Sequence, residues 1–189
     1  NDNLYKSKTL IPFKQDKFTL LTYCQFVFED TFQNVWVVNL NDIFYIDSTQ
    51  KIHVIDFPFI EGSKVRKIRY LEQLNDGNIL FGTSDGVFSY NVTKPNHFVK
   101  INGLNNLDVR FIKEDTKHKI LWVFTYGNGI YIIDKNNKVL TVPIGSHEAL
   151  LYAHYFLEDC HDRMWLPTNN GLYVCDKMSM IQSAYDMDQ

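Results

Sequence analysis

Four polar side chains recur at an equivalent position in the sequence, and their types suit an anionic ligand. Gln25, Arg69, Arg110 and His154 each stand directly before an aromatic residue that opens an apolar segment. Guanidinium groups bind planar anions such as carboxylates through paired hydrogen bonds. We therefore expect these residues to bind a carboxylated or sulfated sugar. A polar channel lined by ordered water would use the same residue types.

A second set of candidates lies in polar segments between the apolar ones. It consists of Tyr126, Asn128, Asn169 and Asn170. Amide and phenol groups pair with carbohydrate hydroxyls, although the same residues are also common turn formers. The longer connecting segments 57–67 and 145–151 are further candidates, because loops on a rigid scaffold often carry binding residues.

Pairs of acidic residues resemble catalytic machinery but are better explained as structure. They are Glu29-Asp30, Glu114-Asp115 and Glu158-Asp159. Glycoside hydrolysis needs two carboxyls facing each other across a bond, whereas these are chain neighbours, and turn hydrogen bonds account for them. The sequence contains no phosphate-binding glycine motif, no nucleophile motif and no two-His zinc spacing. It therefore predicts no catalytic residue, no metal site and no cofactor.

Charge and hydropathy exclude two classes of partner. The 189 residues carry 19 basic and 22 acidic side chains, a net charge of −3, whereas nucleic acids and anionic membranes attract a basic surface. No apolar run reaches the ~18 residues of a membrane-spanning helix. Cys24, Cys160 and Cys175 form no CxxC pattern and are expected to be small buried residues on strands.

The candidate residues belong to a repeat that occurs four times. Each copy reads as an aromatic–aliphatic segment ending in an acidic residue, a polar turn, a large apolar residue, and an aromatic strand. The copies are Phe26–Asp47, Tyr70–Asn91, Phe111–Asp134 and Tyr155–Asp176. Their large apolar residues are Trp36, Leu80, Trp122 and Trp165, at intervals of 44, 42 and 43 residues. We expect the tryptophans to lie in the core.

Another strand is expected after each copy. These strands are Lys51–Ile55, His97–Ile101 and Lys138–Val142, with a last version around Met180–Tyr185. Lys8–Ile11 resembles them without a copy before it. We therefore expect residues 1–22 to be the last strand of a preceding blade with its linker, followed by blades at 23–63, 64–106, 107–150 and 151–189.

Four short antiparallel strands joined by tight turns make one blade of a β-propeller. Segments such as Ile120–Phe124 are apolar almost throughout, which is typical of sheets covered on both faces. No segment shows helical spacing. The sequence thus predicts an all-β fold of four four-stranded blades of about 43 residues each. Because propellers close with about 4 to 8 blades, we expect a partial propeller that is open or self-associated.

The repeat resembles the two-component regulator propeller family. The family pattern is Glu-Asp, a turn glycine, Trp, Thr and then Gly-Leu-aromatic. The fourth copy matches it at Glu158-Asp159, Trp165, Thr168 and Gly171-Leu172-Tyr173. The third copy matches the same positions, while the first has Asn39 and Asp42 where Thr and Gly are expected. The resemblance covers roughly residues 8 to 185.

That resemblance implies an extracytoplasmic sensor. Such repeats are similar to the periplasmic region of hybrid two-component sensor histidine kinases of Bacteroidetes, where polysaccharide breakdown products bind and switch a cytoplasmic kinase. By this resemblance the chain is a non-catalytic, periplasmic sensing segment. Its implied partners are an oligosaccharide and a neighbouring propeller or immunoglobulin-like domain, and the kinase lies outside this chain.

Two other classes of function fit an incomplete propeller. Exposed blade faces and strand edges would make the chain a protein-interaction scaffold or a self-association module. A propeller lyase or glycosidase would need convergent carboxylates or a metal ion, and the sequence provides neither pattern. Fold alone does not choose among these classes.

Overall fold

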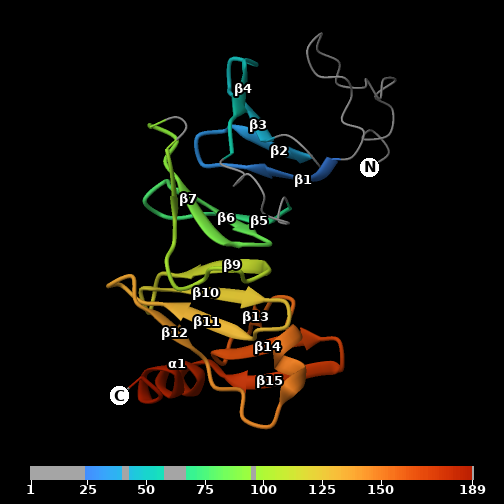
Figure 1. The fold of residues 1–189 in the computed structure, drawn as a ribbon, viewed down its shortest axis with the longest axis vertical. Helices are drawn as coiled ribbons and strands as arrows, with labels where there is room; N and C mark the ends of the chain where they lie inside the picture. Colours follow the sequence, from blue (N-terminus) through green and yellow to red (C-terminus); the bar gives the residue numbers. More distant parts are fainter. Residues whose placement is uncertain (1–23, 40–42, 58–66, 95–96, 189) are drawn as a thin grey trace.

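The described residues form four small antiparallel sheets that follow one another along the long axis of the molecule (Figure 1). The computed structural model describes residues 24–39, 43–57, 67–94 and 97–188. The predicted strand Lys8–Ile11 lies outside these ranges. In every sheet the strands stand side by side in sequence order, which is the meander of a propeller blade. The chain is therefore a partial β-propeller.

The blades keep the predicted order of strands. Blade 1 contains β1 (Cys24–Glu29), β2 (Val35–Asn39), β3 (Ile43–Ile46) and β4 (Ile52–Ile55). Blade 2 contains β5 (Ile68–Gln73), β6 (Ile79–Thr83), β7 (Gly86–Tyr90) and β8 (Phe98–Lys100). Blade 3 contains β9 (Val109–Asp115), β10 (Ile120–Thr125), β11 (Ile130–Ile133) and β12 (Val139–Thr141). After the short 3-10 helix η1 (Glu148–Tyr152), blade 4 contains β13 (Leu157–Glu158), β14 (Arg163–Thr168) and β15 (Gly171–Asp176).

Blade 4 departs from the prediction at its outer edge. The segment Met180–Tyr185 was expected to be a fourth strand, but it lies in a helix, α1 (Lys177–Asp186), and the sheet has three strands. The Asp176 carboxylate starts the helix by accepting a hydrogen bond of 2.7 Å from the Ser179 backbone N–H. Such a cap satisfies one of the free N–H groups of the first turn. The expectation that no segment is helical is therefore wrong here.

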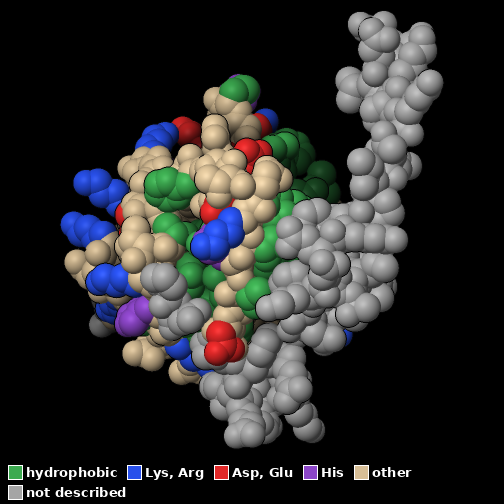
Figure 2. All heavy atoms as spheres, turned by 90° about the horizontal axis from the view of Figure 1, so that it is seen from above, with side chains coloured by type: hydrophobic (Ala, Val, Ile, Leu, Met, Phe, Trp, Pro, Cys, Tyr) green, Lys and Arg blue, Asp and Glu red, His purple; other side chains and the backbone are tan. Residues whose placement is uncertain are grey.

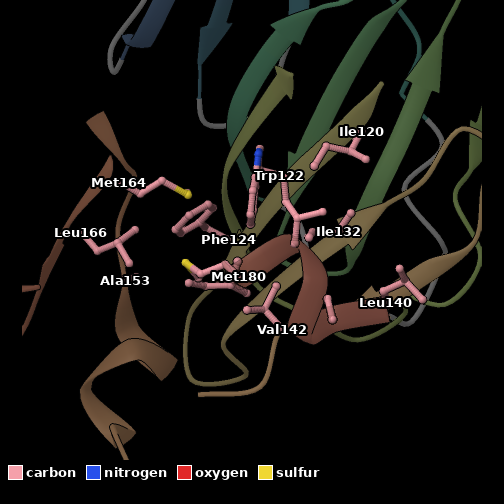
Figure 3. Packing of buried hydrophobic residues seen from close by; sticks show 13 residues of the cluster. Ile120, Trp122, Phe124, Ile132, Leu140, Val142, Ala153, Met164, Leu166 and Met180 are labelled. Atoms are coloured by element: carbon pink, nitrogen blue, oxygen red, sulfur yellow. The ribbon is translucent and has the colours of Figure 1, made fainter. Parts of the chain in front are cut away.

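Hydrophobic clusters fill the space between consecutive blades. Trp36 and Phe81 belong to the cluster between blades 1 and 2, and Leu80 belongs to the one between blades 2 and 3. Trp122 lies between blades 3 and 4, where Met180 of α1 completes the packing (Figure 3). Trp36 and Trp122 are fully buried, which confirms their predicted place in the core.

The turn between the second and third strands is built the same way in three blades. The Thr83 hydroxyl donates to the Gly86 carbonyl at 2.9 Å, and Thr125 and Thr168 make the corresponding bond in blades 3 and 4. Gly86 has a φ of 98°, and a Cβ there would lie 2.4 Å from the Leu104 carbonyl oxygen. Only glycine fits that position, because it alone tolerates both the angle and the close approach.

Candidate functional site

A β-bulge carries the predicted polar residue in each of the first three inner strands. Gln25 is the extra residue at a register shift between β1 and β2. Arg69 and Arg110 occupy the corresponding shifts between β5 and β6 and between β9 and β10. A bulge leaves its extra residue out of the ladder and turns the side chain in a new direction. The repeat therefore redirects the same position in three consecutive blades.

The redirected side chains line one open cavity of about 670 Å³. Gln25, Arg69 and Arg110 contribute from blades 1 to 3, and His154 contributes from the segment that precedes β13. The His154 backbone N–H donates to the Pro167 carbonyl at 3.1 Å, which ties this segment to β14. The structure thus brings together all four residues predicted from their equivalent positions.

Asp108 joins the two arginines at this cavity. Its carboxylate accepts from Arg69 Nε at 3.1 Å and from an Arg69 terminal nitrogen at 3.3 Å. It also accepts from an Arg110 terminal nitrogen at 2.7 Å. All three side chains are about a quarter to a third exposed. Two guanidinium groups share one carboxylate, so the cluster keeps one positive charge beside the cavity.

Arg110 retains unused hydrogen-bonding capacity. Its Nε is buried and has no hydrogen-bond partner. The guanidinium carbon lies 4.8 Å from the ring centroid of Tyr126, which is itself 45% exposed. Tyr126 in turn packs edge-on against Tyr152 of η1, at 5.1 Å between ring centroids. The stacked ring holds the guanidinium plane in place.

The loop residues predicted as ligand contacts divide into two groups. Tyr126 touches Arg110, and the Asn169 Oδ1 lies 2.9 Å from His154 Nε2, so both adjoin residues that line the cavity. Asn128 and Asn170 are exposed and are not part of the cavity lining. The Asn170 backbone N–H donates to the Thr168 hydroxyl at 3.1 Å, which is the role of a turn former.

Of the two connecting loops predicted as candidates, the structure describes the second in full and the first only in part. Residues 58–66 of the first loop lie outside the described residues. The second loop leads into η1, whose Tyr152 supports Tyr126. Sequence reasoning missed Asp108 and Tyr152, because neither lies within the four aligned copies.

The aspartates of the acidic pairs serve the turns, as predicted, whereas Glu158 is paired with Lys177 at 2.6 Å. The Asp159 carboxylate accepts from two backbone N–H groups and from the Trp165 indole at 2.8 Å. Hydrogen bonds from the Arg163 and Trp165 side chains lower the pKa of Asp159, whereas a general acid for glycoside cleavage needs a raised pKa. Asp30 has the same arrangement with Trp36, also at 2.8 Å.

Other potentially reactive groups do not form a second centre in the part of the chain that the structure describes. No group of three or more His, Cys, Asp or Glu side chains there is placed to hold a metal ion. The three cysteines are free, and the expectation that they are buried is wrong for Cys24 and Cys160, which are exposed. Burial raises the pKa of the third, Cys175, to about 11, so little of this thiol is ionised at neutral pH. None of the described helices has the length and apolar character to cross a membrane.

Comparison with known proteins places this fold among propellers. No protein-family model matches the chain, and no curated protein matches it. The extracellular domain of a hybrid two-component system from B. thetaiotaomicron matches with a TM-score of 0.62 and 21% identity, over 82% of this chain and 20% of that one. A second such domain from B. thetaiotaomicron has a TM-score of 0.55 and 16% identity, over 83% and 27%.

An enzyme shares the same architecture. Virginiamycin B lyase from Staphylococcus aureus matches with a TM-score of 0.58 and 14% identity, over 81% of this chain and 55% of the lyase. At these identities the likeness is one of fold. The chain spans little more than half of the lyase and about a quarter or less of the two extracellular domains.

Proposed function

We propose that this chain is a non-catalytic, ligand-binding segment of an extracytoplasmic sensor, and that the cavity at the inner strands binds an acidic oligosaccharide. The observation that carries the proposal is the repeated β-bulge, which directs Gln25, Arg69 and Arg110 toward one cavity together with His154. β-Bulges are over-represented next to active sites, where they turn a side chain in a new direction.

The charges favour an anionic group on the ligand. Arg69, Asp108 and Arg110 together carry one positive charge. A carboxylate or sulfate of the ligand would accept from Arg110 and compete with Asp108 for the guanidinium groups. Because of this competition, Asp108 lowers the affinity of the site for anions, and only an anion that binds tightly displaces it.

The other groups in and beside the cavity suit a sugar better than a small inorganic anion. The cavity volume of about 670 Å³ is within the usual range for organic ligands. Tyr126 presents an exposed ring beside Arg110, and Gln25 and the His154–Asn169 pair supply neutral hydrogen-bonding groups. Amide and imidazole groups pair with hydroxyls, so the site combines one anion contact with several hydroxyl contacts.

The sensor role is proposed from the structures that share this fold and not from the cavity. Two of the similar structures are extracellular domains of hybrid two-component systems. In such a system, ligand binding to the extracytoplasmic region would be passed to a kinase that lies outside this chain. We propose a periplasmic location and polysaccharide breakdown products as ligands on the same basis.

Isothermal titration calorimetry tests the binding part of the proposal. Uronic-acid and sulfated oligosaccharides are titrated into the chain beside neutral oligosaccharides of the same length. We expect saturable binding of at least one acidic oligosaccharide that weakens as salt is added, and no binding of its neutral counterpart. Arg110→Gln should weaken binding at least about tenfold, equivalent to about 1.4 kcal/mol.

Two variants sharpen the test. Asp108→Asn removes the internal competitor and should strengthen binding of the acidic ligand severalfold, whereas loss of binding would contradict the proposed competition. Arg163→Gln, in blade 4 and outside the cavity lining, is the matched control and should leave binding unchanged. Incubation of the ligand with the chain, followed by product analysis, should show no cleavage; turnover would favour a lyase over a sensor.

A further inference from the structure

Blades 1 and 4 share a hydrogen bond between an aspartate and a tryptophan. In blade 1 one oxygen of Asp30 accepts from backbone N–H groups of the turn, and the other accepts from the Trp36 indole at 2.8 Å. In blade 4 Asp159 treats the turn and the Trp165 indole in the same way, also at 2.8 Å. Trp36 is fully buried, whereas Trp165, which was predicted to lie in the core, is only partly buried. The bond therefore belongs to the blade and does not depend on what covers the tryptophan.

Blade 3 has the same two residues in the same register. Trp122 lies opposite Lys113 on β9, and Asp115 follows Lys113 by two positions. Residues two apart on a strand point to the same side, and so do the partners of an antiparallel pair. Asp115 and Trp122 thus share the face of blade 3 that packs against blade 4. From the other blades, a hydrogen bond between them is expected.

That hydrogen bond is missing in blade 3. The Trp122 Nε1 is buried and has no hydrogen-bond partner among the described residues. One Asp115 oxygen accepts from the His118 backbone N–H at 3.1 Å, which is its role in the turn. The other oxygen, Oδ2, lies 3.1 Å from Lys177 Nζ, and the His118 ring lies against both oxygens. Lys177 therefore holds the oxygen that the indole uses in blades 1 and 4.

Lys177 is an unusual lysine, because it is buried. Lysine and arginine side chains normally stand out into water, as Figure 2 shows for the blade 1 end. The Lys177 side chain is only 2% exposed. Removing its ammonium group from water costs free energy, which the ion pairs with Asp115 and Glu158 offset. The docked helix α1 thus leaves one indole N–H unpaired and one ammonium group out of water.

Apolar packing is what holds α1 in place besides these ion pairs. Met180, Ile181 and Ala184 belong to the cluster between blades 3 and 4, where Figure 3 shows Met180. The helix has ten residues, and isolated helices shorter than about 12 residues are marginal in water. The segment is therefore helical because it is docked, and leaving the core would also unfold it. Docking and release are for this reason two discrete states.

We propose that α1 is a releasable helix, and that Asp115 exchanges Lys177 for Trp122 when α1 leaves. In the docked state Asp115 binds Lys177 and the indole is unpaired. In the released state Lys177 returns to water, and the Trp122 indole donates to Asp115 as its counterparts do in blades 1 and 4. Only the Asp115 side chain has to turn, because its backbone stays paired with Ile120. The new hydrogen bond and the hydrated ammonium offset part of the apolar contact that is lost, so the same residues have two arrangements.

The NMR signals of the three indole N–H groups test the exchange at Asp115. Hydrogen bonding moves such a signal downfield, so in the wild type Trp36 should lie downfield of Trp122. In Lys177→Met the Trp122 signal should move toward that of Trp36, and the additional change Asp115→Ala should abolish this shift. Lys117→Met, which removes an exposed ion pair, is the matched control and should leave the signal in place. A Trp122 signal that does not move in Lys177→Met overturns the proposal.

A second variant releases α1 from its apolar side. Ala184 is 1% exposed, so Ala184→Glu places a charge in the core while Lys177 is retained. The backbone amides of α1 should then exchange with deuterium at least about tenfold faster, and the Trp122 signal should move as it does in Lys177→Met. Met178→Glu, at a position of the same helix that is 47% exposed, is the control and should change neither. Two results contradict the proposal: amides that keep their protection in Ala184→Glu, or amides that lose it while the Trp122 signal stays in place.

Discussion

At the scale of single residues, the same position of the repeat has different partners in different blades. The Trp36 indole N–H donates to the buried Asp30 carboxylate at 2.8 Å. The Trp122 indole N–H is buried without a partner, because Asp115 in that blade is bonded to His118 and Lys177 instead. The two tryptophans are equally buried but differ by one charge-assisted hydrogen bond.

That difference predicts unequal costs for two matched substitutions. Trp36→Phe removes the donor and leaves the Asp30 carboxylate short of one bond, whereas Trp122→Phe removes a donor that had no acceptor. Both lose a similar apolar volume, so Trp36→Phe should cost about 1–2 kcal/mol more in unfolding free energy than Trp122→Phe. Urea denaturation of both variants measures it. Equal costs, or a larger cost at Trp122, would show that the indole bond to Asp30 is not stabilising.

Asp115 links stability to pH. Burial acts to raise its pKa, but hydrogen bonds from His118 and Lys177 outweigh burial and lower the pKa to about 2. An unfolded aspartate has a pKa of about 4. Because the folded pKa is the lower one, the ionised carboxylate stabilises the fold above pH ~4, and this contribution is lost as pH falls from ~4 toward ~2.

The prediction is measured as a difference between two proteins. Urea unfolding of the wild type and of Asp115→Asn at several pH values should give a stability gap that is constant above pH ~5 and narrows below pH ~4. The other carboxylates titrate in both proteins, so the comparison isolates Asp115. A gap that stays the same down to pH ~2 would mean that Asp115 does not retain its charge in the fold.

At the scale of elements, α1 is held by an ion-pair network rather than by a sheet ladder. Its first residue, Lys177, has a side chain only 2% exposed, with Nζ 2.6 Å from Glu158 Oε1 and 3.1 Å from Asp115 Oδ2. The network joins the inner strands of blades 3 and 4 to the helix. Met180 and Ala184, one helical turn apart, pack from the same helix into the core between these blades.

Removal of the lysine should loosen this junction. Lys177→Met leaves the nearly buried Asp115 carboxylate without its cation, so we expect a loss of about 3–5 kcal/mol in unfolding free energy. Lys117→Met is the control, since the Lys117–Asp162 pair is exposed and should contribute at most ~1 kcal/mol. Chemical denaturation measures both. A loss at Lys177 no larger than at Lys117 would contradict a structural role for the network.

Strands were predictable from the sequence, whereas the helix and the charge cluster were not. Polar turns and apolar segments recur at the same positions of every copy. The bounds of even short strands such as β8 and β12 were therefore predicted to within a residue or two. The same regularity led to the error at α1, where a fourth strand was expected by analogy. Local signals favoured a helix there, namely the Asp176 cap and the spacing of Met180 and Ala184.

Part of the candidate site was predictable for the same reason. Alignment of the copies identified the four cavity residues, and in blades 1 to 3 the structure places a β-bulge at this point. It gave no information about Asp108, which lies in a connection between blades and meets Arg69 from 39 positions away. Such a contact depends on how two blades pack, and a single sequence contains no periodic signal for it.

At the scale of the whole molecule, the candidate cavity exists only because the blades stand side by side. Each of its four central residues comes from a different blade or from the segment leading into it, and Asp108 bonds across the junction of blades 2 and 3. A ligand in this cavity would therefore hold consecutive blades together. Binding should raise the thermal unfolding temperature of the chain, since the ligand binds the assembled arc and not the unfolded chain.

The most direct test of the central claim is an NMR titration that observes the arginine Nε–H signals of the chain. As an acidic oligosaccharide is added, the signals of Arg69 and Arg110 should shift together along one saturable curve. The signal of Arg163, outside the cavity, should remain in place, and the neutral oligosaccharide should move none of the three. Saturable binding that leaves the Arg69 and Arg110 signals unmoved, or equal shifts with the neutral sugar, would contradict an anion-binding site at the inner strands.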